Sequence, residues 1–316
     1  MAERIVITAM GICSALGDNL EEHLAGLLSG QSGLSVIEHV PTLHRDHIRV
    51  GEIKHTNDFL AQQLGLPVVN HYSRTGLLGI WALKEAIAQA GLTPAEVAQL
   101  SMVMASSVGG MDMTERYFYA YTTQEELRRY IPYHNIGEVT GQIADYFGIK
   151  GYVTSVSTAC SSSANAILTA ANLLRTGRAQ RIAVGGADAL SVFTINGFNS
   201  LMILSDADCT PFDAHRKGLN LGEAGAFLIM EREATALAEG RTIIGVLSGW
   251  GNANDAYHQT ASSEEGEGAF LAMERALHLS GLVPSDIDYI NAHGTATVNN
   301  DLSESRALMR IFGEEV

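Results

Sequence analysis

The stretch "GYVTSVSTACSSSANAILTAANLLRTG" (151–177) decides the fold of this chain. Its first part is rich in β-branched residues, which favours a strand, and the part from Ser163 to Gly177 has helical apolar spacing and a glycine stop. Between the two lies a run of small residues around Cys160. A strand that turns tightly into a helix is the building unit of an α/β protein.

The same alternation extends outward from this unit in both directions. Short apolar runs predict strands at 4–11, 100–107 and 181–190, and helical apolar spacing with a glycine stop predicts a helix at 74–91. Strands alternating with helices indicate a largely parallel sheet with helices on its faces. The predicted fold class is therefore α/β.

An internal repeat indicates that the chain consists of two tandem halves. "EAIAQAGLTPAEVAQLSMVMASS", from Glu85, and "RALHLSGLVPSDIDYINAHGT", from Arg275, place Ala, Gly, Leu and Pro at matching positions, 190 residues apart. The strand at 4–11 has a counterpart at 242–251. We predict a first half at 1–240, which carries Cys160, and the start of a second half at 241–316.

The second half is expected to be incomplete. About 130 residues follow the strand that ends at Ser107 in the first half, whereas the matching strand ends near His293 and the sequence stops at Val316. A sheet without its remaining strands would expose an apolar edge. We therefore expect this sequence to be the N-terminal portion of a longer protein.

Composition excludes several classes of protein. The 316 residues are 46% hydrophobic and 17% charged, and the net charge of −15 argues against nucleic acid as a partner. No apolar run reaches the roughly 18 residues that cross a bilayer, so no membrane association is expected. The N-terminus has no secretion signal, and three distant cysteines indicate a reducing, cytoplasmic location without disulfides or a metal site.

Cys160 is the candidate nucleophile. A thiol at a helix N-terminus faces unpaired N–H groups and the positive end of the helix dipole, which favour the thiolate. The same N–H groups can stabilise an oxyanion on an acyl carbonyl. The alternative is a buried structural cysteine, but the three serines that follow favour a nucleophile. Cys13 and Cys209 lack this setting and are interpreted as structural.

His293 is the candidate partner of the thiol. It stands at the end of a predicted strand in "YINAHGTATVNND" (289–301), and α/β proteins build their sites at such strand ends. Tandem halves can bring two strand ends to one cleft, where a histidine would handle protons for the cysteine. His258 is a weaker candidate, and the other histidines are interpreted as surface or structural residues.

Five segments together resemble β-ketoacyl-acyl carrier protein synthases, in the order in which that family has them. They are "RIVITAMGICSALG" (4–17), "VSTACSSSANAI" (156–167), "PFDAHRKGLNLGEAGAFLIMERE" (211–233), "NDAYHQTAS" (254–262) and "INAHGTATVNND" (290–301). The resemblance covers essentially the whole chain. It implies a thiolase-like fold, with two βαβαβαββ-type halves in an αβαβα layered arrangement, of which the second is truncated.

The resemblance also implies a reaction. Cys160 would take an acyl group from a carrier protein, and malonyl-carrier protein would then lose CO₂ and attack that thioester. His293 would assist decarboxylation, and Thr295, Thr297 and Thr260 would hydrogen-bond the phosphopantetheine arm. That arm arrives on the acyl carrier protein, so no cofactor of the chain's own is implied. The chain length and saturation of the acyl group, and the choice between fatty acid, polyketide and polyene pathways, stay open.

One part of the family pattern is absent. The "KS..GH" segment, with a second active-site histidine and a lysine, does not occur in the sequence. We therefore expect the 316-residue chain to be poorly active unless the missing part is supplied. The family also implies a homodimer, and the adjacent Arg128 and Arg129 are the candidate basic patch for docking an acidic carrier protein.

Three alternatives remain at this point. The first is a condensing enzyme of the thiolase type that uses coenzyme A. The second is a non-catalytic partner subunit of a synthase; such subunits lack the cysteine. The third is a thiol hydrolase with a Cys–His pair, which leaves the segment 211–233 unexplained.

Overall fold

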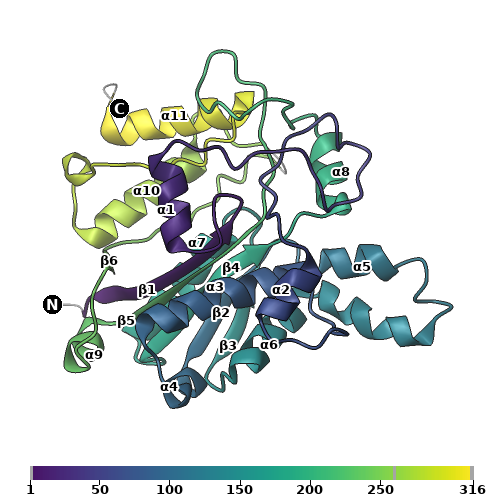
Figure 1. Cartoon of the computed structure of the whole chain (residues 1–316). Helices are drawn as coiled ribbons and strands as arrows, with labels where there is room; N and C mark the ends of the chain where they lie inside the picture. The colour runs from purple at the N-terminus through teal and green to yellow at the C-terminus, as the bar shows by residue number, and fades with distance from the viewer. Residues whose placement is uncertain (1–2, 259–260, 314–316) are drawn as a thin grey trace. The chain divides into compact units, whose positions relative to one another are not determined.

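The computed structural model describes residues 3–258 and 261–313 and divides into two compact units (Figure 1). Unit 1 comprises Met1–Asp46, Val50–Gly197 and Leu221–Val246, and unit 2 comprises His47–Arg49, Phe198–Asn220 and Leu247–Val316. Unit 2 thus includes a segment from the middle of the chain. The boundary at 240/241 that the repeat suggested stays a prediction.

A six-stranded sheet forms the centre of unit 1, in the order β3-β2-β4-β5-β1-β6. The strands are β1 (Ile5–Ser14), β2 (Ser101–Ala105), β3 (Val153–Val156), β4 (Arg181–Asp188), β5 (Ala224–Arg232) and β6 (Gly245–Leu247). The strands predicted at 4–11, 100–107, 151–160 and 181–190 are confirmed as β1, β2, β3 and β4.

The expectation of a largely parallel sheet needs a correction. β2 runs parallel to β3 and β4, but β5 runs antiparallel to both β4 and β1, so the sheet is mixed. A parallel neighbour needs a crossover that returns the chain to the same end of the sheet, whereas an antiparallel neighbour does not. The long connection between β4 and β5 leads the chain into β5 from the end at which β4 finishes.

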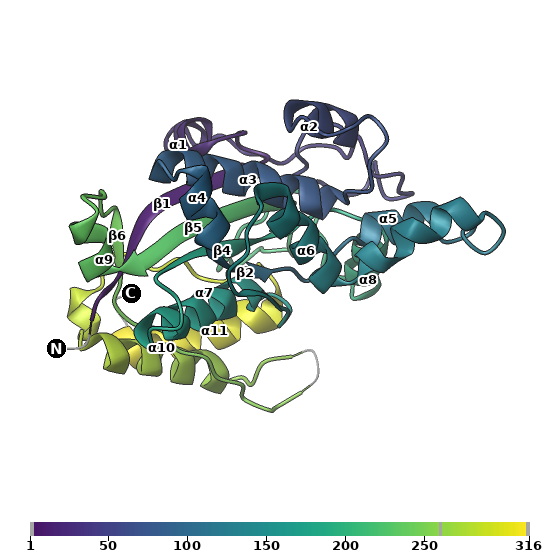
Figure 2. The same cartoon turned by 90° about the horizontal axis from the view of Figure 1, so that it is seen from below.

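Helices cover both faces of this sheet. The helices between β1 and β6 are α1 (Leu20–Leu28), α2 (Asn57–Gln63), α3 (Arg74–Ala90), α4 (Pro94–Gln99), α5 (Met111–Tyr117), the 3₁₀ helix η1 (Glu125–His134), α6 (Ile136–Phe147), α7 (Ser162–Arg175), α8 (Val192–Ser200) and α9 (Glu233–Ala238). Figure 2 shows α3 on one face, against β1 and β5, and α7 on the other, against β4 and β2. Across the described residues, no helix is both long and apolar enough to span a membrane.

Helix α3 confirms the helix predicted at 74–91, and its ends explain why. The Ser73 side chain accepts a hydrogen bond from the Gly76 N–H and caps the first turn. Gly91, with φ of 62°, ends the helix in the left-handed conformation that favours glycine. Gly225 of β5 lets α3 lie directly on the sheet, since a Cβ there would come within 2.4 Å of the Leu78 carbonyl oxygen.

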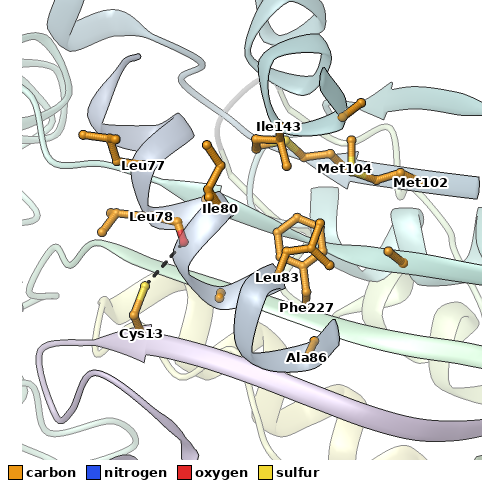
Figure 3. Packing of buried hydrophobic residues seen from close by; sticks show 14 of the residues in the cluster. Cys13, Leu77, Leu78, Ile80, Leu83, Ala86, Met102, Met104, Ile143 and Phe227 are labelled. Atoms are coloured by element: carbon orange, nitrogen blue, oxygen red, sulfur yellow. Dashed lines mark hydrogen bonds between the residues drawn. The ribbon is translucent and has the colours of Figure 1, made fainter. Parts of the chain in front are cut away.

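The hydrophobic core lies between α3, α6 and the sheet (Figure 3). Leu78 and Leu83 of α3, Phe227 of β5 and Met104 of β2 are almost completely buried. Cys13 also belongs to this core, where its thiol lies 3.5 Å from the Leu78 carbonyl oxygen. Its 2% exposure confirms the interpretation of Cys13 as a structural cysteine, and burial raises the pKa of its thiol to about 12.

Unit 2 contains the second copy of the repeat, only part of which forms as predicted. α10 (Glu267–Ser280) ends at Gly281, whose φ of 72° matches that of Gly91, and the 3₁₀ turn η2 (Pro284–Asp286) takes the place of α4. α11 (Val298–Phe312) packs against α10.

The prediction of a strand that ends near His293 is wrong. Between residues 287 and 297 the chain forms neither helix nor strand, and Tyr289 is 80% exposed. The repeat also predicted a strand at 242–251 as the counterpart of β1, and only the short β6 forms there. A strand exists through ladder hydrogen bonds to a neighbour, and no described segment pairs with residues 287–293.

Candidate active site

Cys160 lies in a tight turn between β3 and α7. β3 ends at Val156 and α7 begins at Ser162, so the predicted direct passage from strand to helix at Cys160 is corrected to a turn of five residues, 157–161. Cys160 is exposed. Its neighbour Ala159 has φ of 52°, a conformation that costs a non-glycine residue energy and that recurs at functional turns.

Two of the serines around Cys160 hold this turn together. The Ser162 hydroxyl donates to the Ala159 carbonyl at 2.6 Å and accepts from the Thr158 N–H at 2.9 Å. The Ser161 hydroxyl donates to the Thr158 carbonyl at 2.8 Å. The serines therefore do more than leave space for a substrate, because they fix the strained backbone that presents the thiol.

Asp188 organises the neighbouring loop at the same edge of the sheet. Because β2, β3 and β4 are parallel, their carboxyl ends meet at one edge. Asp188, the last residue of β4, accepts hydrogen bonds from the Ser106 hydroxyl at 2.6 Å and from the Ser107 N–H at 2.8 Å. The sequence analysis missed this residue, although an acid at the end of a predicted strand was a usable signal.

A cavity of about 650 Å³ opens next to this turn. Ser107 and Ser157 form part of its wall, and the Ser107 hydroxyl donates to the Ala159 carbonyl at 3.4 Å. Gly109, which follows the lining residue Val108, lies close to the backbone of His134, another lining residue: a Cβ on Gly109 would lie 2.4 Å from the His134 carbonyl oxygen. The cavity therefore adjoins the backbone that carries the thiol.

Asp112, which follows the lining residue Met111 in α5, is a half-buried residue whose carboxyl group is desolvated. Its Oδ2 accepts the Arg74 N–H at 2.9 Å, while the buried Oδ1 has no hydrogen-bond partner among the described residues. Burial raises the pKa of Asp112 from 3.8 to about 6, against the opposing effect of the backbone N–H groups of Arg74 and Met113.

Replacing Asp112 by Asn is predicted to change how stability depends on pH. The folded state holds a proton on this group more tightly than the unfolded state, so the wild-type protein loses stability as the pH rises from about 4 to about 6. The variant lacks this loss. Its free energy of unfolding should therefore exceed that of the wild type by up to about 3 kcal/mol as the pH rises through that range. Urea unfolding at several pH values measures the difference. If the free energies of unfolding of the two proteins change with pH in the same way, the raised pKa of Asp112 is refuted.

His293 lies in unit 2, in a loop whose backbone is hydrogen-bonded to side chains of α11. Its backbone N–H donates to Glu304 Oε1 at 2.7 Å, and the Gly294 N–H donates to Oε2 at 2.9 Å. Asp301, which is 2% exposed, accepts the Ala296 N–H at 3.1 Å. Gly294 and Ala296 both have positive φ, of 52° and 57°. Two carboxylates one turn apart on α11 thus hold a strained loop that presents His293.

A second cavity, of about 310 Å³, adjoins His293. Its wall includes Glu304, Asn300 and Asp255. The Ser263 N–H donates to Asp255 at 2.8 Å, and this bond, the largest of several causes, lowers the pKa of Asp255. This carboxylate keeps a negative charge at the wall.

The remaining predicted residues lie in different places. The hydroxyls of Thr295 and Thr297 are 2.8 Å apart in the His293 loop, Thr260 lies outside the described residues, and His258 is exposed in unit 2. Cys160 belongs to unit 1 and His293 to unit 2, so their pairing stays a prediction. The sequence analysis also missed Glu304 and Asp301, although their three-residue spacing at the start of a helix was a usable signal.

Removing the Glu304 clamp is predicted to impair the reaction without unfolding the protein. Glu304→Ala removes the acceptor of two backbone N–H groups and frees the loop, so we expect the condensation that the family resemblance implies to fall about 10- to 100-fold. Glu304→Gln, which keeps one acceptor oxygen, should lose less. Acylation of Cys160, followed by mass spectrometry, is the control measurement; an equal loss in acylation would contradict a role confined to the His293 loop.

Two family models match the chain consecutively. "Beta-ketoacyl synthase, N-terminal domain" matches residues 2–236, and "Beta-ketoacyl synthase, C-terminal domain" matches residues 244–316. The chain therefore belongs to the β-ketoacyl synthase family. The resemblance read from the motifs is confirmed, and so is the thiolase-like fold class.

Relatives of known function agree with this family. The chain is 31% identical over 324 residues to a 3-oxoacyl-[acyl-carrier-protein] synthase 2 of Staphylococcus aureus (strain COL), covering 99% of this chain and 78% of the relative. It is 30% identical over 325 residues to the enzyme of that name from Vibrio harveyi, with the same coverage. The assignment to the β-ketoacyl-acyl carrier protein synthases, which are acyltransferases, is confirmed.

Solved structures match over nearly the full chain. A ketosynthase in complex with its chain length factor from Xenorhabdus doucetiae is 32% identical, with a TM-score of 0.84, covering 99% of this chain and 77% of that one. A β-ketoacyl synthase from Burkholderia phymatum STM815 is 26% identical, with a TM-score of 0.86 and coverage of 99% and 79%.

Proposed function

We propose that Cys160 accepts an acyl group as a thioester and that the protein elongates this group by decarboxylative condensation with malonyl-acyl carrier protein. The observation that carries this proposal is the exposed thiol on a strained, serine-held turn, next to a cavity of about 650 Å³. An activated nucleophile needs access, a fixed position and room for its substrate.

The proposed reaction has two steps. In the first, the Cys160 thiolate attacks the acyl thioester on the carrier protein and a new C–S bond forms. The C–S bond between the acyl group and pantetheine breaks, and the departing pantetheine thiolate takes up the proton that Cys160 lost on ionisation. In the second, malonyl thioester loses CO₂, its enolate carbon attacks the acyl carbonyl on Cys160, and the C–S bond breaks to restore the thiolate. The product is a β-ketoacyl chain that is two carbons longer.

The other residues take supporting roles in this proposal. The backbone N–H of Cys160 contributes to an oxyanion hole. His293 assists decarboxylation by orienting water or stabilising the enolate oxygen, and Thr295 and Thr297, together with Thr260, hydrogen-bond the pantetheine arm. The arm arrives on the carrier protein, so the chemistry needs no cofactor bound by this chain, and the reaction takes place in the cytoplasm.

A second copy of the chain is the proposed subunit partner. β3 is the edge strand of the sheet, and an edge strand offers its N–H and C=O groups to another chain. The loop at 106–111 follows β2, the strand next to β3. A homodimer that pairs along β3 would extend the sheet across both copies.

Reversing the charge of the proposed docking patch is predicted to weaken use of the carrier protein. Arg128 and Arg129 are exposed on η1; Arg128 is 3.8 Å from Glu125, and Arg129 lies over the Tyr130 ring at 4.9 Å. Replacing both by Glu should raise KM for acyl-acyl carrier protein about tenfold, with a smaller dependence on salt. An equal loss with a small thioester donor would contradict docking there, and Arg4→Glu, on another part of unit 1, is the matched control.

The test of the proposed function follows both steps on the purified protein. Acyl-acyl carrier protein alone should add the acyl mass to the peptide that contains Cys160, and later addition of malonyl-acyl carrier protein should release a product two carbons longer. Acylation of a different residue, or no acylation at all, would overturn the proposal. The second outcome would favour a non-catalytic partner subunit.

A further inference from the structure

The peptide group between Ala159 and Cys160 carries an inference about how acyl transfer is promoted, and this inference rests on the proposed function. The Ala159 carbonyl oxygen accepts three hydrogen bonds, from the Ser162 hydroxyl at 2.6 Å, the Ser162 N–H at 3.0 Å and the Ser107 hydroxyl at 3.4 Å. A carbonyl oxygen has two lone pairs, so its acceptor capacity is fully used. The N–H of Cys160 is the other end of this same peptide group.

Hydrogen bonds to the carbonyl fix the direction of this N–H. The peptide group is planar and trans, so its C=O and N–H point to opposite sides. Holding the Ala159 oxygen therefore also holds the Cys160 N–H. Ala159 has φ of 52°, a conformation that persists in a non-glycine residue only where the surrounding structure enforces it. The three hydrogen bonds supply that enforcement.

The same hydrogen bonds strengthen the N–H as a donor. Hydrogen bonds in series polarise one another, so a donor on the carbonyl oxygen of an amide increases the positive partial charge on its N–H. When a thiolate attacks an acyl carbonyl, the electron pair of the C=O bond moves to its oxygen, and a preorganised N–H stabilises this oxyanion. An amide whose carbonyl is already bonded is oriented and polarised before the substrate arrives.

Ser107 reaches this carbonyl from the loop that follows β2, and Asp188 holds that loop. Asp188 Oδ1 accepts the Ser107 N–H at 2.8 Å and the Val108 N–H at 3.2 Å. It also accepts the Ser106 hydroxyl at 2.6 Å, which in turn accepts the Gly109 N–H at 2.9 Å. The bond from the Ser107 hydroxyl is long, as hydrogen bonds in active sites often are before the substrate binds.

We propose that Ser162 and Ser107 are positioning residues for acyl transfer, because their hydroxyls orient and polarise the amide that contributes the Cys160 N–H to the oxyanion hole. Neither side chain needs to touch the substrate. Asp188 acts one step further away, through Ser107. The contribution of these residues belongs to steps in which an oxyanion forms, and it is separate from the access and ionisation of the thiol.

The experiment compares two reactions of the same sulfur. Octanoyl-acyl carrier protein acylates Cys160 through an oxyanion, whereas iodoacetamide alkylates the thiolate by displacing iodide and forms no oxyanion. The mass of the peptide that contains Cys160 gives both rates. Ser107→Ala should lower the acylation rate at saturating carrier protein about three- to fivefold, while KM and the alkylation rate stay within about twofold of the wild type.

Further variants are compared by the ratio of the acylation rate to the alkylation rate. Ser162→Ala removes the shorter bond and should lower this ratio about tenfold or more. The ratio is needed because Ser162 also accepts the Thr158 N–H and so supports the turn. Ser107→Thr keeps the hydroxyl and should restore the wild-type ratio. Ser29→Ala, which removes a 3.0 Å bond from a hydroxyl to the Gly26 carbonyl at the end of α1, is the matched control and should keep that ratio.

A double variant tests the role of Asp188. Asp188→Asn alone should lower the ratio towards that of Ser107→Ala, because the loop that carries the hydroxyl is no longer held in the same way. If Asp188 acts through Ser107, the double variant should stay within about twofold of Ser107→Ala. Losses that multiply in the double variant would overturn the action of Asp188 through Ser107.

The outcomes separate this inference from the proposed function. A wild-type ratio in Ser107→Ala and Ser162→Ala would overturn the inference. Equal losses of acylation and alkylation would overturn it too, because the serines would then act on the thiol itself; acylation of Cys160 in the wild-type protein would still stand in both cases. A wild-type protein that iodoacetamide labels at Cys160 but that octanoyl-acyl carrier protein does not acylate would overturn the proposed function, and the inference with it.

Discussion

Replacing Cys160 by Ala should abolish acyl transfer, with elongation reduced by at least about a thousandfold. The reason is covalent: without the sulfur, no acyl-enzyme thioester can form, and the two-step reaction loses its intermediate. Because Cys160 is exposed and the turn is held by Ser161 and Ser162, the variant should fold normally. Intact mass after incubation with acyl-acyl carrier protein should show no adduct.

The matched control uses another thiol of the same protein. Cys13 is buried in the core of unit 1, and burial raises its pKa to about 12, so its thiolate does not form near neutral pH. Cys13→Ala should therefore retain acylation, and iodoacetamide should label Cys160 while it spares Cys13. An acyl adduct that persists in Cys160→Ala would place the nucleophile elsewhere.

The second large effect is expected at the buried ion pair of Arg74 and Glu223. Arg74 Nε and Nη2 donate to the two Glu223 oxygens at 2.8 and 2.6 Å, and the side chains are 7% and 0% exposed. Burial alone would lower the pKa of Arg74, but the hydrogen bonds and charge of Glu223 raise it overall. Arg74 therefore keeps a positive charge that needs its partner.

Glu223 also joins separate segments of unit 1. It accepts the Ile53 N–H at 2.9 Å and the Leu190 N–H at 3.1 Å, while Arg74 donates to the Ile53 carbonyl at 2.8 Å. The pair thus ties the start of α3 to the loop after residue 50 and to the end of β4. Loss of either partner leaves a buried charge and unpaired backbone groups.

Glu223→Gln should lower the free energy of unfolding by about 3–5 kcal/mol, because the Arg74 charge stays buried without compensation. Urea unfolding measures the change. Glu265→Gln, which breaks the exposed pair with Arg306 at 3.1 Å, is the control and should cost less than about 1 kcal/mol. Equal losses in the free energy of unfolding of the two variants would show that burial does not increase the contribution of the Arg74–Glu223 pair to stability.

The sequence predicted best those features whose causes lie among neighbouring residues. Helix α3 was predicted with nearly its observed ends, because Ser73 and Gly91 cap it locally. The turn at Cys160 was also identified, since a β-branched run, small residues and a helical pattern follow one another directly. The repeat predicted the glycine stop at Gly281 for the same reason.

The features that the sequence analysis did not predict all depend on contacts with residues that are distant in sequence. The antiparallel direction of β5 results from its pairing with β4 and β1, and nothing within Ala224–Arg232 specifies that direction. The segment before His293 has the composition of a strand, but no described segment forms the backbone hydrogen bonds of a neighbouring strand with it. Asp188 and Glu304 looked like ordinary surface acids until the fold placed backbone N–H groups against them.

The amino-acid sequence by itself therefore determined the family, the caps of α3 and the nucleophile turn, because each is encoded in consecutive residues. Only the tertiary structure decided the mixed sheet and the carboxylates that hold the Ser107 and His293 loops. Hydrogen bonds between distant segments have no local signature: they form only after packing of the apolar core has brought those segments together.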